Sequence, residues 1–212
     1  MHTDPRKPQL GPGNRLGTLF FVAILLGACQ GPANLTVNER LDATSGVTLR
    51  GAQEAIAFAR TESRYSRSAR DYIYLGPVET NRQGRRDYYL WVGIATTLDR
   101  GFVAPTRDTP QTLQIELRGE PMVLTLLPWS ERAAGLQRSE LYTPPVTVQI
   151  ELAARVALDQ LDLLATEAPS SIRVADGEGR TQLYSRWDDE SAWLGFFDST
   201  AAVPSQQQAF AD

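Results

Sequence analysis

The sequence predicts a mainly β fold, an antiparallel β-sandwich-like domain with one or two short helices, and an α+β fold is the alternative. From Gly46 onward, turn signals separate short apolar runs about every ten residues, a spacing typical of a sandwich or barrel and not of a helical bundle. Turn sequences join several of these runs into hairpins. The chain has 212 residues, 42% of them hydrophobic, enough for one core and short for two. We therefore expect one globular domain over residues 46–200.

The first 28 residues have the layout of an export signal. Residues 1–15 are polar and basic, and residues 16–26 (LGTLFFVAILL) are uncharged and nearly all apolar. This apolar run is shorter than the roughly 20 residues that a membrane-spanning helix needs. We therefore predict that residues 1–28 are a cleaved signal peptide.

Leu26, Gly27, Ala28 and Cys29 resemble the lipobox of bacterial lipoprotein precursors. The resemblance implies that the Cys29 sulfur receives a diacylglycerol, that cleavage falls between Ala28 and Cys29, and that the new amino group is acylated. It covers only about the first 30 residues and says nothing of the remainder. The alternative is a plain secretory leader in which Cys29 has no role.

The resemblance also implies a location. Gln30 stands where an aspartate would favour retention in the inner membrane, so an outer-membrane anchor facing the periplasm is implied. Two or three acyl chains would hold a soluble domain at a membrane durably. Residues 29–45 include Gly31 and Pro32 and predict a tether, and residues 201–212 predict a disordered tail. Because Cys29 is the only cysteine, the core must stabilise the domain without an internal disulfide.

The charge balance bears on partners. The leader holds three of the 21 basic and one of the 25 acidic residues, so the remainder carries a net charge near −6. A body of that sign repels polyphosphate and anionic head groups at long range. We therefore expect no nucleic acid and no peripheral electrostatic membrane contact, and we expect membrane lipid to be contacted through acylated Cys29.

The elements follow in order along the chain. Residues 47–49 and 55–59 are candidate strands, and the polar stretch 60–70 predicts a loop or a short solvated helix. Residues 72–79 and 87–97 predict a hairpin around the turn at 81–84. Tyr88, Leu90, Val92 and Ile94 alternate with Tyr89 and Trp91, so both faces of this hairpin are apolar and a second layer must cover one of them.

Two further hairpins are predicted. Residues 113–117 alternate between apolar and polar side chains, turn at 119–121 and return over 122–127. Residues 172–175 and 182–187 form the other, around the turn at 176–179.

Between these hairpins lies a strand from Val146 followed by a helix through residues 158–165, with one long helix over 147–167 as the alternative. At the carboxyl end, Asp189 is expected to cap a short helix that places Trp193, Phe196 and Phe197 on one face.

Missing residue types exclude most familiar catalysis. His2 is the only histidine and Lys7 the only lysine, and both lie in the leader. Without an imidazole there is no serine–histidine or cysteine–histidine nucleophile and almost no zinc site. Without a lysine there is no Schiff base and no phosphate-binding P-loop.

Carboxylates remain as candidate chemistry. A paired-carboxylate glycoside hydrolase is the formal alternative, with Asp188, Asp189, Glu190, Glu116, Glu151 and Asp159 as its acids. The same residues are better explained as helix caps and as the polar faces of strands. Asp176 and Glu178 lack the ligand ladder of a calcium loop. We predict no catalytic residue, no metal ligand and no cofactor.

Two groups of side chains predict binding surfaces. The first is a local basic patch of Arg60, Arg64, Arg67 and Arg70, joined by Arg82, Arg85 and Arg86, which would meet lipopolysaccharide phosphates or an acidic partner. The second is an aromatic group that would line a sugar or peptide groove or form a second core layer, and it comprises Tyr72, Tyr74, Tyr89 and Trp91.

We expect a non-catalytic binding or assembly role in the envelope, with an envelope protein or a glycan as partner. The alternatives are a carboxylate-dependent hydrolase and an interaction module that presents the arginine-rich loop.

Overall fold

The computed structural model describes residues 37–99, 110–132, 141–188, 193 and 195–197, all in the unit that starts at Thr36. The predicted leader with Leu26, Gly27 and Ala28, the lipidation site Cys29 and the tail at 201–212 lie outside these residues. So do Asp189 and Glu190.

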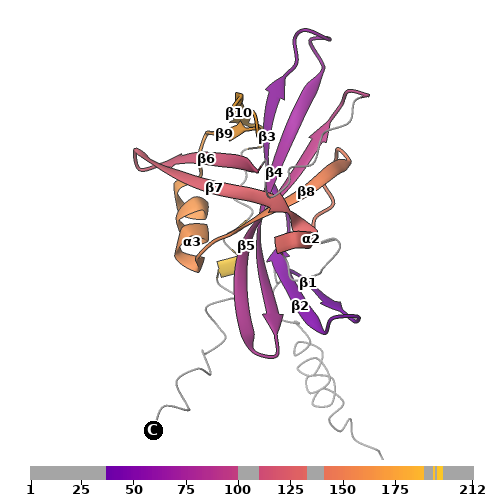
Figure 1. Cartoon of the computed structure of the whole chain (residues 1–212), viewed down its shortest axis with the longest axis vertical. Helices are drawn as coiled ribbons and strands as arrows, with labels where there is room; N and C mark the ends of the chain where they lie inside the picture. Colours follow the sequence, from indigo (N-terminus) through magenta and orange to yellow (C-terminus); the bar gives the residue numbers. More distant parts are fainter. Residues whose placement is uncertain (1–36, 100–109, 133–140, 189–192, 194, 198–212) are drawn as a thin grey trace, which may run out of the picture. The chain divides into compact units, whose positions relative to one another are not determined.

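The described residues form ten strands and two helices (Figure 1). The strands are β1 (Val37–Asp42), β2 (Val47–Ala52), β3 (Ile56–Thr61), β4 (Arg70–Arg82), β5 (Arg85–Thr96), β6 (Gln111–Leu117), β7 (Glu120–Pro128), β8 (Val148–Arg155), β9 (Ser171–Ala175) and β10 (Thr181–Arg186). The helices are α2 (Trp129–Arg132) and α3 (Leu158–Glu167). No helix among these residues is both long and apolar enough to cross a membrane.

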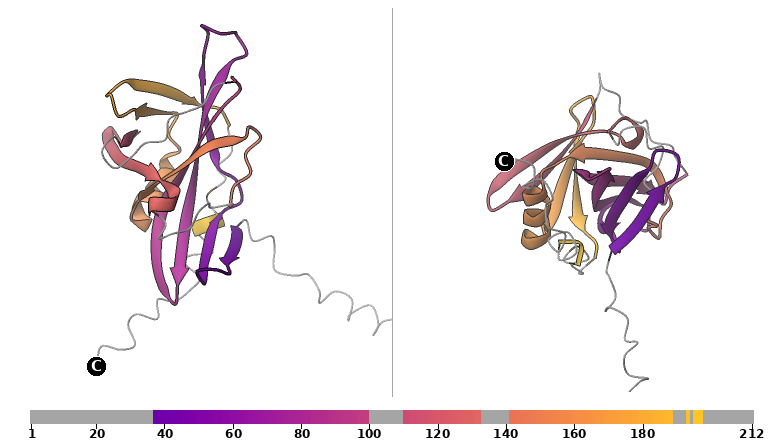
Figure 2. Two further views of the ribbon diagram at one scale, coloured as in Figure 1. Left: turned by 45° about the vertical axis from the view of Figure 1, so that its right-hand side comes forward. Right: turned by 90° about the horizontal axis from the view of Figure 1, so that it is seen from below.

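Eight of the strands close into an antiparallel barrel. The hydrogen-bonded order is β4-β3-β10-β9-β6-β7-β8-β5, and β5 pairs again with β4 to complete the ring. Figure 2 shows the strands arranged around a common axis when the molecule is seen from below. The β1–β2 hairpin extends the sheet along the second half of β4, where β2 pairs with Val78 to Asn81.

The predicted sandwich is therefore wrong in architecture, although the mainly β class with short helices is confirmed. Alternating apolar residues and frequent turns occur in sandwiches and barrels alike, so the pattern does not separate them. The strand order distinguishes the two architectures. β4 pairs with β3 on one side and with β5 on the other, and the sheet runs from β3 through β10, β9, β6, β7 and β8 back to β5. Closure removes the free edges that a sandwich would leave on these strands.

The barrel interior is one apolar cluster to which all eight strands contribute. Its buried members include Phe58 of β3, Ile73 of β4, Val92 of β5 and Leu126 of β7. Leu161, Leu164 and Ala165 of α3 join it, as do Trp193 and Phe196 near the carboxyl end. An eight-stranded barrel is just wide enough for side chains to fill, so this interior is a packed core.

A second apolar cluster covers the outside of β4 and β5. Its buried members include Val78 and Trp91 on these strands, Leu49 on β2, Trp129 in α2, and Tyr142. The expectation that a second layer covers this hairpin is confirmed. The layer is not a second sheet, because it is built from β2, α2 and the irregular segment 141–146.

The three predicted hairpins are confirmed. The first turns at Gln83 and Gly84, both with positive φ (53° and 89°), as a two-residue type I′ turn requires. The second turns at Arg118 and Gly119 (52° and 83°), one residue earlier than expected, so that Glu120 already belongs to β7.

The region after the paired prolines is also confirmed as a strand followed by a helix. β8 pairs with β5 over most of its length, which excludes one long helix over 147–167.

One predicted boundary needs correction. Residues 37–42 were expected in the tether, but they form β1, which pairs with β2 through six residue pairs. Being at the edge of the sheet, β1 is only half-buried, and its Leu41 is exposed. The stretch consequently shows little of the apolar alternation by which a strand is predicted from sequence.

Candidate functional site: an aromatic groove outside the barrel

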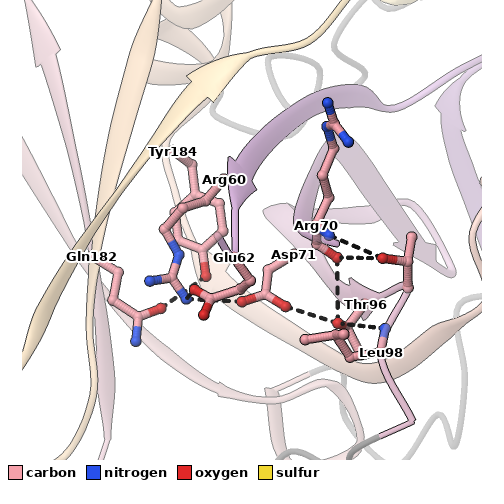
Figure 3. Close-up of polar contacts among 9 residues, drawn as sticks. Arg60, Glu62, Arg70, Asp71, Thr96, Leu98, Gln182 and Tyr184 are labelled. Carbon is pink, nitrogen blue, oxygen red and sulfur yellow. Dashed lines mark hydrogen bonds and ion pairs between the residues drawn. The ribbon is translucent and has the colours of Figure 1, made fainter. Parts of the chain in front are cut away.

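The seven arginines of the predicted patch are divided between the two ends of β4, with Arg60, Arg64, Arg67 and Arg70 at one end. Arg60 lies on β3 and its guanidinium contacts two carboxylates, Glu62 at 2.5 Å and the buried Asp71 at 2.8 Å (Figure 3). It also lies 5.5 Å from the ring centre of Tyr184. Thr96 donates to the other oxygen of Asp71 at 2.8 Å. Arg60 therefore belongs to an ion-pair network at one end of the barrel.

Three other arginines lie near Arg60, in the β3–β4 loop or at the start of β4. Arg70 stacks on Trp187, with 4.9 Å between its guanidinium carbon and the ring centre, while Arg64 and Arg67 lie exposed in the loop before β4. Arg82, Arg85 and Arg86 sit at the opposite end of β4 (Figure 1). A strand of 13 residues spans roughly 40 Å at about 3.3 Å per residue, so the two groups cannot form one surface.

The candidate carboxylates are dispersed as well. Glu116 lies 3.9 Å from Arg173 on the barrel surface, Glu151 accepts the indole N–H of Trp91 at 3.0 Å, and Asp159 lies in the first turn of α3. Asp176 and Glu178 both pair with Arg180, at 2.8 and 3.0 Å. The Arg180 side chain holds the pKa of Asp176 below its ordinary value. In the part of the chain that the structure describes, no group of three or more acidic, cysteine or histidine side chains is placed to hold a metal ion.

The predicted aromatic group belongs to the outer core cluster, in which Tyr74, Tyr89 and Trp91 are buried and Tyr72 is partly buried. Tyr72 and Tyr74 also line a groove of about 400 Å³. The groove lies between the outer face of β3 and β4, the segment 142–146, and the two residues that follow β10. Its lining residues are Gln53, Glu54, Ala55, Ala57, Tyr72, Tyr74, Tyr142, Thr143, Pro144, Pro145, Val146, Trp187 and Asp188.

Three aromatic rings form the wall of the groove. Tyr72 and Tyr74 stand two residues apart on β4, so their side chains share a face and stack at 5.9 Å with 8° between the rings. Trp187 meets Tyr72 edge-on, at 6.1 Å and 88°. Trp187 is 56% exposed, and this makes it the accessible ring of the groove.

Tyr142 anchors the segment that forms the opposite wall. Its hydroxyl donates to the Pro77 carbonyl at 2.6 Å and accepts from the Ala52 N–H at 3.1 Å. Burial raises the pKa of Tyr142, so the phenol stays protonated and able to donate. Asn38 of β1 supports the same segment by donating to the Leu141 carbonyl at 2.9 Å.

Asp188 contributes a partly buried carboxylate to the wall of the groove. One of its oxygens accepts the Ala57 N–H at 2.6 Å, and the other lies 3.4 Å from Nε of Arg186. Burial raises the pKa of Tyr74, and the nearby Tyr72 and Asp188 act in the same direction against a hydrogen bond from Val146. Tyr74 is therefore a neutral hydroxyl in the groove. Glu54, at the rim, is exposed and forms no ion pair with another described residue.

The groove offers flat apolar surfaces and hydrogen-bonding groups in a volume that suits a small ligand. Sequence reasoning named Tyr72, Tyr74 and Asp188 but missed Trp187 as the exposed ring of the groove and missed the wall at 142–146. The sequence predicts Trp187 as the last residue of a strand. Trp187 comes close to β4 because β10 pairs with β3, and β3 pairs with β4. Pro144 and Pro145 indicate an irregular segment, but they do not predict which part of the fold this segment packs against.

Comparison with protein-family models, with curated proteins and with solved structures finds no match for this chain.

Proposed function

We propose that this chain is a lipoprotein of the bacterial envelope, held in the outer membrane by acylated Cys29 and facing the periplasm, and that its barrel is a non-catalytic binding module. The groove is the proposed binding site, and a glycan chain is the proposed ligand. The observation that carries the proposal is the exposed ring of Trp187 beside the stacked Tyr72 and Tyr74, in a groove that is open at the surface.

A sugar ring suits these walls because it has an apolar face and a polar edge. The apolar face would pack on an aromatic ring, while the hydroxyl groups would donate to nearby oxygen atoms. Gln53, Glu54 and Asp188 supply such oxygen atoms. The partners of Asp188 fix its position, so the site is already organised before a ligand enters.

A carboxylate-dependent hydrolase is the second candidate, because Glu54 and Asp188 line the same groove. A glycosidase needs two carboxyl groups that face each other across the scissile bond. Asp188 already accepts the Ala57 N–H and lies against Arg186, and both contacts favour a binding role.

Mass spectrometry of the amino-terminal peptide from fractionated cells tests the anchor. We expect the mature chain to start at an acylated Cys29, and we expect Cys29→Ala to release the protein from the membrane. An unmodified peptide or a retained leader would overturn this part of the proposal.

A titration with N-acetylglucosamine oligomers tests the groove. We expect them to change the tryptophan fluorescence of the full-length protein, and we expect Trp187→Ala to abolish binding. Trp187→Phe should retain part of it, because a flat ring remains. No response to any oligomer length would reject the glycan. Release of shorter oligomers would establish the hydrolase, and binding of a proline-rich peptide instead would identify a protein partner.

A further inference from the structure

A second hollow, of about 200 Å³, lies at the turn end of the β4–β5 hairpin. Its lining residues are Val47, Thr80, Arg82, Arg85, Asp87, Tyr89 and Arg155. Three of these side chains are arginines and one is a carboxylate. Positive charge is therefore concentrated here on a body that is acidic as a whole.

The topology brings these residues to one face. Arg82 pairs with Arg85 across the hairpin and Thr80 pairs with Asp87, while β8 places Arg155 directly opposite Tyr89. Residues opposite each other in antiparallel strands project to the same side. Val47 and Tyr89 belong to the outer core cluster, so they give the hollow a rigid apolar floor.

Asp87 holds two of the guanidinium groups in place. Arg155 pairs with one of its oxygens, and Nε of Arg85 lies 3.6 Å from the other. The carboxylate is only 20% exposed, whereas Arg85 and Arg155 are 75% and 61% exposed. The negative charge of Asp87 is therefore largely buried, whereas the two guanidinium groups that it orients extend into solvent.

We infer that this hollow is a binding site for a phosphate group. A guanidinium presents five donors in a planar fork that matches phosphate oxygens, and one carboxylate cannot satisfy two such groups. Thr80 is part of the lining, and its hydroxyl contacts the Asp87 carbonyl at 3.4 Å. A phosphomonoester is the ligand class that fits best, because its oxygen atoms can accept hydrogen bonds from the exposed guanidinium groups of both Arg85 and Arg155.

The phosphate could belong to a lipid head group or be free in solution. If the anchor proposed above holds, seven residues separate Cys29 from Val37, and the eight steps between these two residues reach at most about 28 Å. Val37 pairs with Ala52, five positions from Val47 of the hollow, so head groups of the anchoring membrane are within reach of the site. The phosphate site itself does not depend on that anchor.

The test uses the full-length protein in a zwitterionic detergent, with the arginine Nε–H signals followed by nuclear magnetic resonance. Inorganic phosphate, dihexanoyl phosphatidic acid and dihexanoyl phosphatidylcholine are added in separate titrations. We expect the signals of Arg85 and Arg155 to shift with the first two probes and not with phosphatidylcholine. Tighter binding of phosphatidic acid would identify a lipid head group as the source, and equal binding would identify a free phosphate.

A pair of double variants controls for net charge. Arg85→Gln/Arg155→Gln should weaken phosphate binding by about tenfold or more, because each guanidinium contributes a charge-assisted contact. Arg64→Gln/Arg67→Gln removes the same charge from the loop at the other end of β4 and should leave binding unchanged. No shift at millimolar phosphate, or an equal loss in both double variants, would overturn the inference. Neither result bears on the groove, which the oligomer titration tests separately.

Discussion

The ring of Tyr142 lies directly over the backbone of Gly76, so that a methyl group on residue 76 would stand 2.4 Å from the Cζ atom of the ring. On the other side, a methyl group on Gly51 would stand 2.7 Å from the hydroxyl oxygen. The ring also packs at 4.9 Å from Trp91. The Tyr142 ring thus helps to hold the irregular segment that walls the groove against the barrel, and two strands leave space for the ring by carrying glycine.

Gly76→Ala should therefore destabilise the protein by about 1–3 kcal/mol, because the added methyl group has no room beside Tyr142. Urea unfolding measures the change. In a Tyr142→Ala background the same substitution should cost far less, since the clashing ring is gone. Equal costs in the two backgrounds would mean that the clash with the ring is not the cause.

Tyr142→Phe should cost about 1–3 kcal/mol, because it leaves the buried Pro77 carbonyl and the Ala52 N–H without their partner. It should also weaken ligand binding in the groove, since segment 141–146 loses the two hydrogen bonds of the Tyr142 hydroxyl. Tyr65→Phe is the matched control. Its side chain is exposed, so the stability should change by less than about 0.5 kcal/mol.

The buried carboxyl of Glu79 should make the free energy of unfolding decrease as the pH rises above 4.5, the ordinary pKa of a glutamate. The carboxyl is 1% exposed, and burial raises its pKa above the ordinary 4.5, although Arg86 and Arg50 oppose the shift. These arginines lie 3.4 and 3.7 Å away, and neither makes a hydrogen bond to the carboxylate oxygens, so desolvation outweighs them. The native state then binds more protons than the unfolded state above pH 4.5.

The free energy of unfolding, measured by urea titration at a series of pH values, should therefore fall as the pH rises through that window. Glu79→Gln should flatten the decline. The carboxylates with lowered pKa values, Asp42 and Asp176, act in a different window, because their contribution is lost only as the pH falls below the ordinary 3.8. An unchanged slope in Glu79→Gln would show that another group titrates.

Trp187 should account for nearly all of the tryptophan fluorescence that acrylamide can quench in the native protein. The chain has four tryptophans, and Trp91, Trp129 and Trp193 are each 1% exposed. Trp187→Phe should therefore remove the accessible fraction and shift the remaining emission to shorter wavelength. If quenching persists in this variant, one of the buried rings must become accessible in solution.

The elements were predictable where local chemistry determines them. Asn81, Gln83 and Gly84 specify a tight turn between apolar strands, and the hairpin forms as expected, with the Asn81 side chain accepting the Gly84 N–H at 2.9 Å. The helix after β8 also followed from the spacing of Leu161 and Leu164. These features depend on residues that are close in sequence.

The architecture and the groove depend on residues far apart in sequence. The pairing of Ser185 with Ala59 closes the barrel, and no local pattern in either strand specifies that partner. Arg60 appeared as a surface charge because its neighbours in sequence are polar, yet its carboxylate partner Asp71 lies on the next strand. These contacts were not predicted because they join strands that no tight turn connects.

The junction of β3 and β10 is short, with only two paired residues on each strand. Beyond these pairs, the backbone N–H of Trp187 donates to the Ala57 carbonyl at 2.9 Å, and the Asp188 side chain accepts the backbone N–H of Ala57. The last bonds that fasten this junction are thus made by two residues of the groove. A ligand held there would protect the Ala57 and Trp187 amides from hydrogen exchange and slow the local opening of the barrel, so occupancy could be followed from the backbone alone.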